Sequence, residues 1–279
     1  MKIPLIVACA LLVLAGIILN SDVFAESASE LVDNTTGWIL ETTSFFEVEV
    51  EHITRDHNEH PELYSMNSEG FRGSEFIKNK PDDTYRIIAV GGSTTFGSGV
   101  TNENTWPIIL EKKLQNISEG KNIEVINAGI AGMNSLEGSK LIKEKLIHFK
   151  PDLIIIFDGN NDTACRMVEH STKEHNEPKE RKIELCGAYL PDTYDEMYAE
   201  RWSEICKLGA ENGFETVFIL QPIPHFGKVL TDQEIVKSFF FRAEHPHYLN
   251  SLESFAQQLS SIEKHCTKAA DFREIFDYY

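Results

Sequence analysis

Four short, almost unbroken apolar runs alternate with four longer segments in which apolar residues recur at helical spacing. The runs span residues 86–90, 123–126, 152–157 and 216–220. The longer segments span residues 105–115, 135–149, 194–213 and 249–270. Short continuous apolar runs are typical of strands buried on both faces of a parallel sheet. The alternation therefore predicts an α/β fold, a flavodoxin-like three-layer α/β/α sandwich with a mostly parallel sheet.

The first 25 residues have the features of a secretory signal peptide. Lys2 precedes an apolar run, and Val23 and Ala25 occupy the −3 and −1 positions of a cleavage site. An uncleaved membrane anchor is the alternative, although the run is shorter than the roughly 20 residues that span a bilayer. We therefore expect a secreted or extracytoplasmic protein, with an extension at residues 26–66 and the α/β domain at residues 67–279.

The chain is strongly acidic, with a formal net charge of −18. Nucleic acid is disfavoured as a partner, because phosphate binding needs a basic face. Attraction to an anionic membrane surface is disfavoured for the same reason. The charge therefore indicates a solvated acidic surface, without membrane contact beyond the N-terminal segment.

Four cysteines follow the leader: Cys165, Cys186, Cys206 and Cys266. An even number in an exported chain predicts two disulfides, with four free thiols as the alternative. We expect Cys165–Cys186, which brackets the polar segment 169–184, and Cys206–Cys266, which links the third and fourth helices. The other connectivities stay open. The spacing Cys-x-x-Cys does not occur, so no metal site is indicated.

Polar or glycine-rich turns follow the first three predicted strands, and the carboxyl ends of parallel strands meet at one edge of a sheet. Ser93 comes after Gly91-Gly92, where a tight turn projects its hydroxyl from that edge. The N–H of Gly132 and the amide of Asn161 follow the next two strands and can donate to an oxyanion. The turn after the first strand lacks the lysine of a nucleotide-binding phosphate loop and the Gly-x-Gly-x-x-Gly of a dinucleotide-binding loop. A flavodoxin-like binding protein is the alternative to a catalytic site.

In this order the turns resemble three sequence blocks of the SGNH/GDSL hydrolases. Residues 91–97 (GGSTTFG) are similar to block I, residues 127–132 to block II and residues 159–162 (Gly-x-Asn-Asp) to block III. Residues 67–73 look like a lead-in of the branch that carries GGST. The resemblance implies Ser93 as nucleophile, Gly132 and Asn161 in the oxyanion hole, and no metal or organic cofactor. Candidates for lining the substrate site are Thr94, Asp162 and His225.

The family's last block, Asp-x-x-His, does not occur in this chain. His225 follows the fourth predicted strand, and His245 and His247 lie in a predicted loop, so these are the candidate substitutes for the base. Residues 271–272 look like the exit of a fifth strand, after which the family's chain continues. We therefore expect the domain to be C-terminally incomplete, with an exposed apolar patch on the sheet and very weak catalysis by this chain alone.

Together these features predict an exported serine esterase or acylhydrolase. It would act on O-acyl esters, O-acetyl esters included, through an acyl-serine intermediate. Cell-envelope polysaccharide and small acyl esters are the expected substrates. The alternative is a catalytically inactive ligand- or carbohydrate-binding relative, or a truncated fragment.

Overall fold

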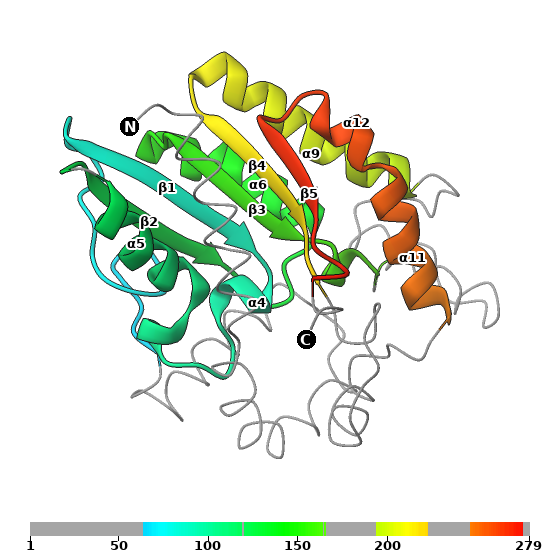
Figure 1. Ribbon diagram of the computed structural model, residues 1–279, viewed down its shortest axis with the longest axis horizontal. Helices are drawn as coiled ribbons and strands as arrows, with labels where there is room; N and C mark the ends of the chain where they lie inside the picture. The colour runs from blue at the N-terminus through cyan, green and yellow to red at the C-terminus, as the bar shows by residue number, and fades with distance from the viewer. Residues whose placement is uncertain (1–63, 119, 164, 166–193, 223–245, 276–279) are drawn as a thin grey trace. The chain divides into compact units, whose positions relative to one another are not determined.

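The computed structural model describes residues 64–118, 120–163, 165, 194–222 and 246–275. In this part of the chain, the predicted alternation of strands and helices is confirmed as a five-stranded parallel sheet with the order β2-β1-β3-β4-β5 (Figure 1). The strands are β1 (Thr84–Gly91), β2 (Asn122–Gly129), β3 (Leu153–Asp158), β4 (Glu215–Leu220) and β5 (Lys268–Asp271). The helices are α4 (Ser93–Phe96), α5 (Trp106–Ile117), α6 (Ser135–Glu144), α9 (Tyr194–Asn212), α11 (Pro246–Gln257) and α12 (Leu259–Glu263). Two 3-10 turns are η1 (Asn102–Asn104) and η2 (Leu146–Phe149).

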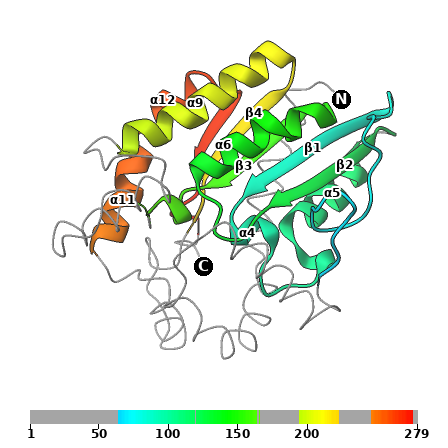
Figure 2. The ribbon, with the colours of Figure 1, turned by 180° about the vertical axis from the view of Figure 1, so that it is seen from behind.

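The chain divides into two compact units, Met1–Gly132 with Glu144–Ile156, and Met133–Lys143 with Phe157–Tyr279. In the first unit, β1 and β2 pair in parallel from Thr84↔Asn122 to Gly91↔Gly129. All of β1 is buried, as its continuous apolar sequence predicts. Helix α5 packs alongside β2 (Figure 2) and buries Trp106, Leu110 and Leu114, while Pro107 lies in its first turn.

Strand β2 is an edge strand of this sheet, and side chains of α5 cover its outer backbone groups. The N–H of Ile123 donates to Gln115 Oε1 at 2.8 Å, and the N–H of Val125 donates to Glu111 Oε2 at 2.7 Å. Glu111 and Gln115 are four residues apart and therefore share one face of the helix. Further along, the backbone of Asn127 forms an antiparallel bridge with Arg72.

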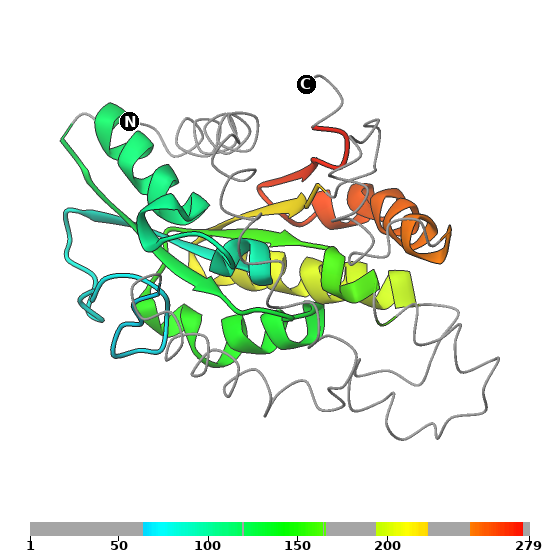
Figure 3. The same cartoon turned by 90° about the horizontal axis from the view of Figure 1, so that it is seen from below.

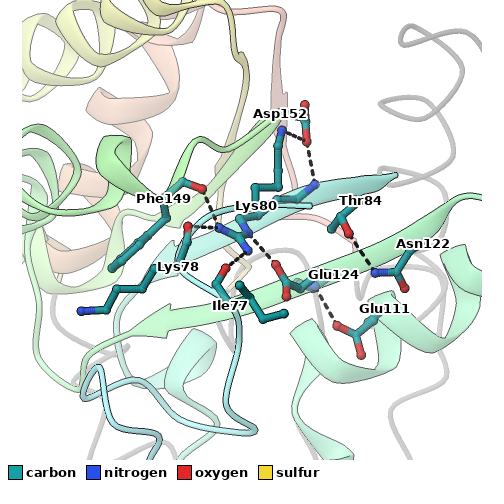
Figure 4. Close-up of polar contacts among 11 residues, drawn as sticks. Ile77, Lys78, Lys80, Thr84, Glu111, Asn122, Glu124, Phe149 and Asp152 are labelled. Atoms are coloured by element: carbon teal, nitrogen blue, oxygen red, sulfur yellow. Dashed lines mark hydrogen bonds and ion pairs between the residues drawn. The ribbon is translucent and has the colours of Figure 1, made fainter. Parts of the chain in front are cut away.

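A buried arginine fastens the amino end of β1. The side chain of Arg86 is fully buried and pairs with Glu124 of β2. Its guanidinium also donates to the carbonyls of three residues from neighbouring segments, which are Ile77, Lys78 and Phe149 (Figure 4). A planar guanidinium with five donors can satisfy several acceptors at once, so one side chain ties these segments together.

The second unit is built around an aromatic cluster between its helices and β4. Tyr198 of α9 stacks on Phe255 of α11 with ring centroids 4.2 Å apart, and Trp202 lies 6.0 Å from Phe218 of β4. These rings are buried, and such pairs add to the energy of burial. Helix α9 runs alongside β4, and β4 pairs in parallel with β5 (Figure 3).

Two of the predicted helices end earlier than expected. The helix expected at 135–149 ends at Glu144, and the 3-10 turn η2 follows it. The helix expected to continue to Ala270 is wrong beyond Glu263, because residues 268–271 form β5. In this segment the hydrogen bonds to β4 outweigh the helix propensity of Ala269 and Ala270.

The Cys206–Cys266 disulfide is confirmed and joins α9 to the turn between α12 and β5. Cys165 is also disulfide-bonded. Its expected partner, Cys186, lies outside the described residues, so that pairing stays a prediction.

Several other predictions also lie outside the described residues, namely the leader, the extension up to residue 63, the polar segment 169–184, and His225 and His245. The prediction of a loop at His247 is wrong, because this residue lies in the first turn of α11. Within the described ranges, the large apolar side chains that are exposed are Ile77 and Ile117. Neither lies on a strand, so the apolar patch expected on the sheet does not occur in this part of the chain. In that same part, every helix is too short or too polar to cross a membrane.

Candidate active site

Ser93 is the first residue of α4, which begins as soon as β1 ends (Figure 1). Gly92 is the N-cap residue, and its carbonyl accepts the N–H groups of Thr95 and Phe96, both at 3.0 Å. The helix stops after one turn at Gly97, whose left-handed φ of 87° suits glycine. Ser93 and Thr94 are half-buried, so the serine stands at the carboxyl end of a parallel strand with part of its surface accessible.

Gly129 allows the end of β2 to lie directly against α4. A Cβ at this position would be 2.2 Å from the nitrogen of Phe96 and 2.6 Å from the carbonyl carbon of Thr95, so any larger residue would displace the helix backbone. The N–H of Ile130 donates to the carbonyl of Gly91 at 3.0 Å, which joins the exits of β2 and β1. Block II therefore supports the turn that carries Ser93.

Two further polar side chains hold the same turn, and their function had not been predicted from the sequence. Asn127 is buried and donates from Nδ2 to the carbonyl of Phe96 at 3.3 Å, while its Oδ1 accepts the N–H of Gly129 at 3.0 Å. Arg72 comes from the lead-in segment and donates to the same Phe96 carbonyl and to the carbonyl of Gly97. A buried polar side chain in an otherwise apolar strand was the available signal for Asn127.

In the second unit, block III follows β3 and a helix begins at Asn160. Asn161 is half-buried, and its Nδ2 donates to the carbonyl of Met133 at 2.8 Å. The adjacent Asp162 accepts the N–H of Ser135 at 2.8 Å, the hydroxyl of Ser135, and the hydroxyl of Tyr194 at 2.8 Å. Both residues of the Asn-Asp pair are therefore bonded to the segment that follows block II.

The expectation that Asp162 lines the substrate site is wrong. Its side chain is completely buried, and its two carboxylate oxygens are occupied by Ser135 and Tyr194. Arg201 also belongs to this cluster, because its Nη1 donates to the Ser135 hydroxyl at 2.9 Å. Asp162 is thus a structural group that connects the β3 exit to α6 and α9.

Burial also changes the proton affinity of the two carboxyl groups at the end of β3. Burial raises the pKa of Asp158 well above its ordinary value, and the nearby charge of Asp162 raises it further. Trp202 Nε1 donates to Asp158 Oδ2 at 3.1 Å, which acts in the opposite direction. For Asp162, burial raises the pKa, and the hydrogen bonds from Ser135 and Tyr194 partly offset that effect.

A capping box starts α6 just after block II. Asn134 Oδ1 accepts the N–H of Leu136 at 3.0 Å and of Glu137 at 3.2 Å, and Glu137 Oε2 accepts the N–H of Asn134 at 3.0 Å. This reciprocal pair satisfies orphan donors at the helix start. Asn-x-x-Glu before an amphipathic segment was a readable signal in the sequence. The cap places Ser135 where it meets Asp162.

Of the predicted site residues, Ser93 and Gly132 belong to the first unit and Asn161 to the second. Each follows the carboxyl end of its strand, and Gly132 has a left-handed φ of 79°. Their approach to one reacting carbonyl stays a prediction. His148 and His265, by contrast, precede the amino ends of β3 and β5. The described residues contain no cluster of three or more His, Cys, Asp or Glu side chains that could hold a metal ion.

No protein-family model matches the chain. Over 126 residues it is 28% identical to the esterase TesA of Pseudomonas aeruginosa, and the match covers 43% of this chain and 62% of TesA. The chain thus spans less than two thirds of that relative's length.

Solved structures of similar arrangement include LAE5, an α/β hydrolase enzyme from the metagenome of Lake Arreo, Spain, with 14% identity and a TM-score of 0.48 over 70% of this chain and 80% of LAE5. Another is AlinE4, an SGNH-hydrolase family esterase, with 18% identity and a TM-score of 0.45 over 71% of this chain and 80% of AlinE4.

The three turns, each at the exit of its own parallel strand, occur in the order of the SGNH/GDSL blocks. Together with the similarity to TesA, this order supports an SGNH/GDSL hydrolase.

Proposed function

We propose that this chain is a serine esterase or acylhydrolase with Ser93 as its nucleophile. The observation that carries the proposal is the position of Ser93, half-buried at the first residue of a one-turn helix that begins where β1 ends. A serine held in such a turn presents its hydroxyl to a substrate while its own N–H lies at a helix start. The similarity to an esterase, TesA, supports the same reaction class.

In the proposed reaction, Ser93 Oγ attacks the carbonyl carbon of an O-acyl ester while a base removes its proton. The negative charge on the carbonyl oxygen is stabilised by the N–H groups of Ser93 and Gly132 and by the amide of Asn161. The proton returns to the leaving alcohol as the ester C–O bond breaks, which leaves an acyl-serine. Water then releases the acid, or a second alcohol accepts the acyl group.

The base is the open part of this proposal, because Asp-x-x-His does not occur in the chain. His225, His245 and His247 are the candidates. Exchanging each for Ala should identify the base as the histidine whose loss lowers turnover as much as the loss of Ser93. Loss of one member of such a triad costs several orders of magnitude in rate.

The missing motif also favours a second candidate, a ligand- or carbohydrate-binding relative that has the fold without the base. Labelling with a fluorophosphonate probe separates the two, because a serine reacts with the probe only when a base activates it. The wild type should be labelled and should hydrolyse a short-chain aryl ester, and Ser93→Ala should do neither. Ser98→Ala is the matched control, since Ser98 is exposed on the same turn. An unlabelled wild type would support the binding relative.

Export is the second part of the proposal, and O-acyl esters of cell-envelope polysaccharide are the proposed substrates. The leader at residues 1–25 supports export. Sequencing the N-terminus of the mature protein tests it, since cleavage after Ala25 leaves Glu26 as the first residue. An intact N-terminus in the membrane fraction would instead indicate an anchor.

A further inference from the structure

Arg72 is bound to the turn that follows Ser93 by hydrogen bonds to several of its backbone carbonyls. Its Nη1 donates to the carbonyls of Phe96 at 3.0 Å and of Gly97 at 2.6 Å, and its Nη2 donates to the carbonyl of Val100. Its Nε donates to Asn102 Oδ1 at 2.8 Å. The side chain is only 3% exposed, so these bonds form out of contact with water.

These bonds reach Ser93 through two consecutive peptide groups. Phe96 C=O and Gly97 N–H belong to one peptide group, and Gly97 N–H donates to the Ser93 carbonyl at 2.8 Å. Gly97 C=O and Ser98 N–H belong to the next, and Ser98 N–H donates to the same carbonyl at 3.0 Å. Arg72 Nη1 is therefore linked to the Ser93 carbonyl oxygen by two routes, one through each peptide group. Each route consists of two hydrogen bonds in series, and such bonds polarise and strengthen one another.

The aromatic surroundings keep the guanidinium in this position. Its central carbon lies 4.4 Å from the ring centre of Tyr64 and 5.1 Å from that of Phe96. The Tyr64 hydroxyl also accepts the N–H of Gly99 at 3.3 Å. The two ring centroids are themselves 5.7 Å apart, so the cation lies against a pair of rings that contact each other. Its edge faces the carbonyl end of α4, a geometry that favours arginine over lysine.

A helix of one turn has no internal partners for its last carbonyls and is weakly held by its own hydrogen bonds. Arg72 supplies those partners from a segment more than twenty residues earlier in the sequence. We propose that Arg72 is the positioning residue that holds the Ser93 turn in its reactive geometry, an inference that rests on the proposed function of Ser93. It acts through the backbone and does not contact the substrate.

The test compares Arg72→Lys with Arg86→Lys, a control at the other end of β1. Both arginines are buried, and both donate to three backbone carbonyls and one side-chain oxygen. Two quantities are measured in each variant, the rate constant for fluorophosphonate labelling of Ser93 and the amide hydrogen exchange of residues 93–100. Melting temperatures of both variants report the general loss of stability.

Arg72→Lys should lower the labelling rate constant by about 10- to 100-fold, since small displacements of a reacting group have effects of this size. It should also speed exchange at Gly97 and Ser98. Arg86→Lys should lower the melting temperature without either change. Equal effects of the two variants on Ser93 would overturn the proposal.

If the wild type is not labelled at all, the proposed function fails, and hydrogen exchange alone decides the role of Arg72. Faster exchange confined to residues 93–100 in Arg72→Lys then supports it, and unchanged exchange overturns it. Should Arg72→Lys not fold, Asn102→Ala removes the acceptor of Nε, together with the contacts of Asn102 to Ser65. That variant should show a smaller decrease in the labelling rate constant of Ser93 and a smaller increase in amide exchange at Gly97 and Ser98. If neither quantity changes, the proposed role of Arg72 is overturned.

Discussion

Asn161 donates a hydrogen bond from its side-chain amide to the carbonyl oxygen of Met133, with a distance of 2.8 Å. A carbonyl can only accept, so this bond determines which end of the amide is nitrogen and which is oxygen. One N–H of the amide is used in this bond, and the second is the donor that the proposed oxyanion hole would use. The neighbouring bond from Ser135 N–H to Asp162 fixes the same turn from the other side.

Asn161→Asp should therefore lower kcat of ester hydrolysis while leaving KM little changed. The carboxylate has no donor, faces the Met133 carbonyl, and brings negative charge to the proposed oxyanion hole. Loss of one such donor typically costs about 100- to 1000-fold in kcat. Steady-state kinetics with a short-chain aryl ester measures this. Asn122→Ala is the control, because Asn122 lies at the amino end of β2, where its side-chain amide donates to the Thr84 hydroxyl. Full activity of Asn161→Asp would exclude Asn161 from the oxyanion hole.

Gly129→Ala should disturb the Ser93 turn, because the added Cβ overlaps the backbone of Phe96. Overpacking of this kind costs about 1–3 kcal/mol, and here the strain falls on α4. We expect lower stability in urea and a large loss of probe labelling at Ser93. Gly138→Ala serves for comparison, since its nearest new contact is the Trp202 ring at 3.0 Å. It should cost stability without slowing the labelling, and equal labelling in the two variants would contradict the prediction.

Asp158→Asn should reduce the pH dependence of stability. The native state holds the Asp158 proton to higher pH than the unfolded chain does, because burial raises its pKa above the ordinary 3.8. In the window above that value the native state binds more protons, so this contribution to the free energy of unfolding falls as pH rises through the native pKa. Each tenfold difference in proton affinity contributes about 1.4 kcal/mol. Denaturation in urea at a series of pH values measures the slope, and the same slope in both proteins would refute the assignment.

Removing the Cys206–Cys266 disulfide should destabilise the second unit. The bond closes a loop with a sequence separation of 60 residues, and a bridge of this span contributes about 2–4 kcal/mol through the unfolded state. The double variant Cys206→Ala with Cys266→Ala should unfold at a lower temperature than the oxidised wild type. A melting temperature unchanged by the double substitution would show that the bridge adds nothing to stability.

Much of the fold could be predicted because its signals are local. The run at residues 86–90 predicted β1, and the observed strand extends it by a few residues to Thr84 and Gly91. The end of the last helix could not be predicted in this way. Ala269 and Ala270 favour a helix by propensity, and only pairing with β4, which is distant in sequence, makes them a strand.

In the candidate site, too, features that depend on adjacent residues could be predicted, and features that depend on distant residues could not. Ser93 could be located from Gly91 and Gly92, because a tight turn after a strand depends on adjacent residues. The function of Arg72 and the burial of Asp162 depend on partners 24 to 32 residues away, at Phe96, Ser135 and Tyr194. Such contacts leave no periodic pattern in the sequence, because they depend on how distant segments pack together.

The covering of β2 by α5 affects the tendency of this protein to associate with other copies of itself through β-pairing. The backbone N–H groups of an edge strand ordinarily attract strands from other chains, which is a common start of aggregation. Here the outward N–H groups of Ile123 and Val125 are bound by Gln115 and Glu111, and Asn127 is bridged to Arg72. A foreign strand would have to displace all three before it could pair. This edge of the sheet is therefore protected against intermolecular β-pairing while the protein stays folded.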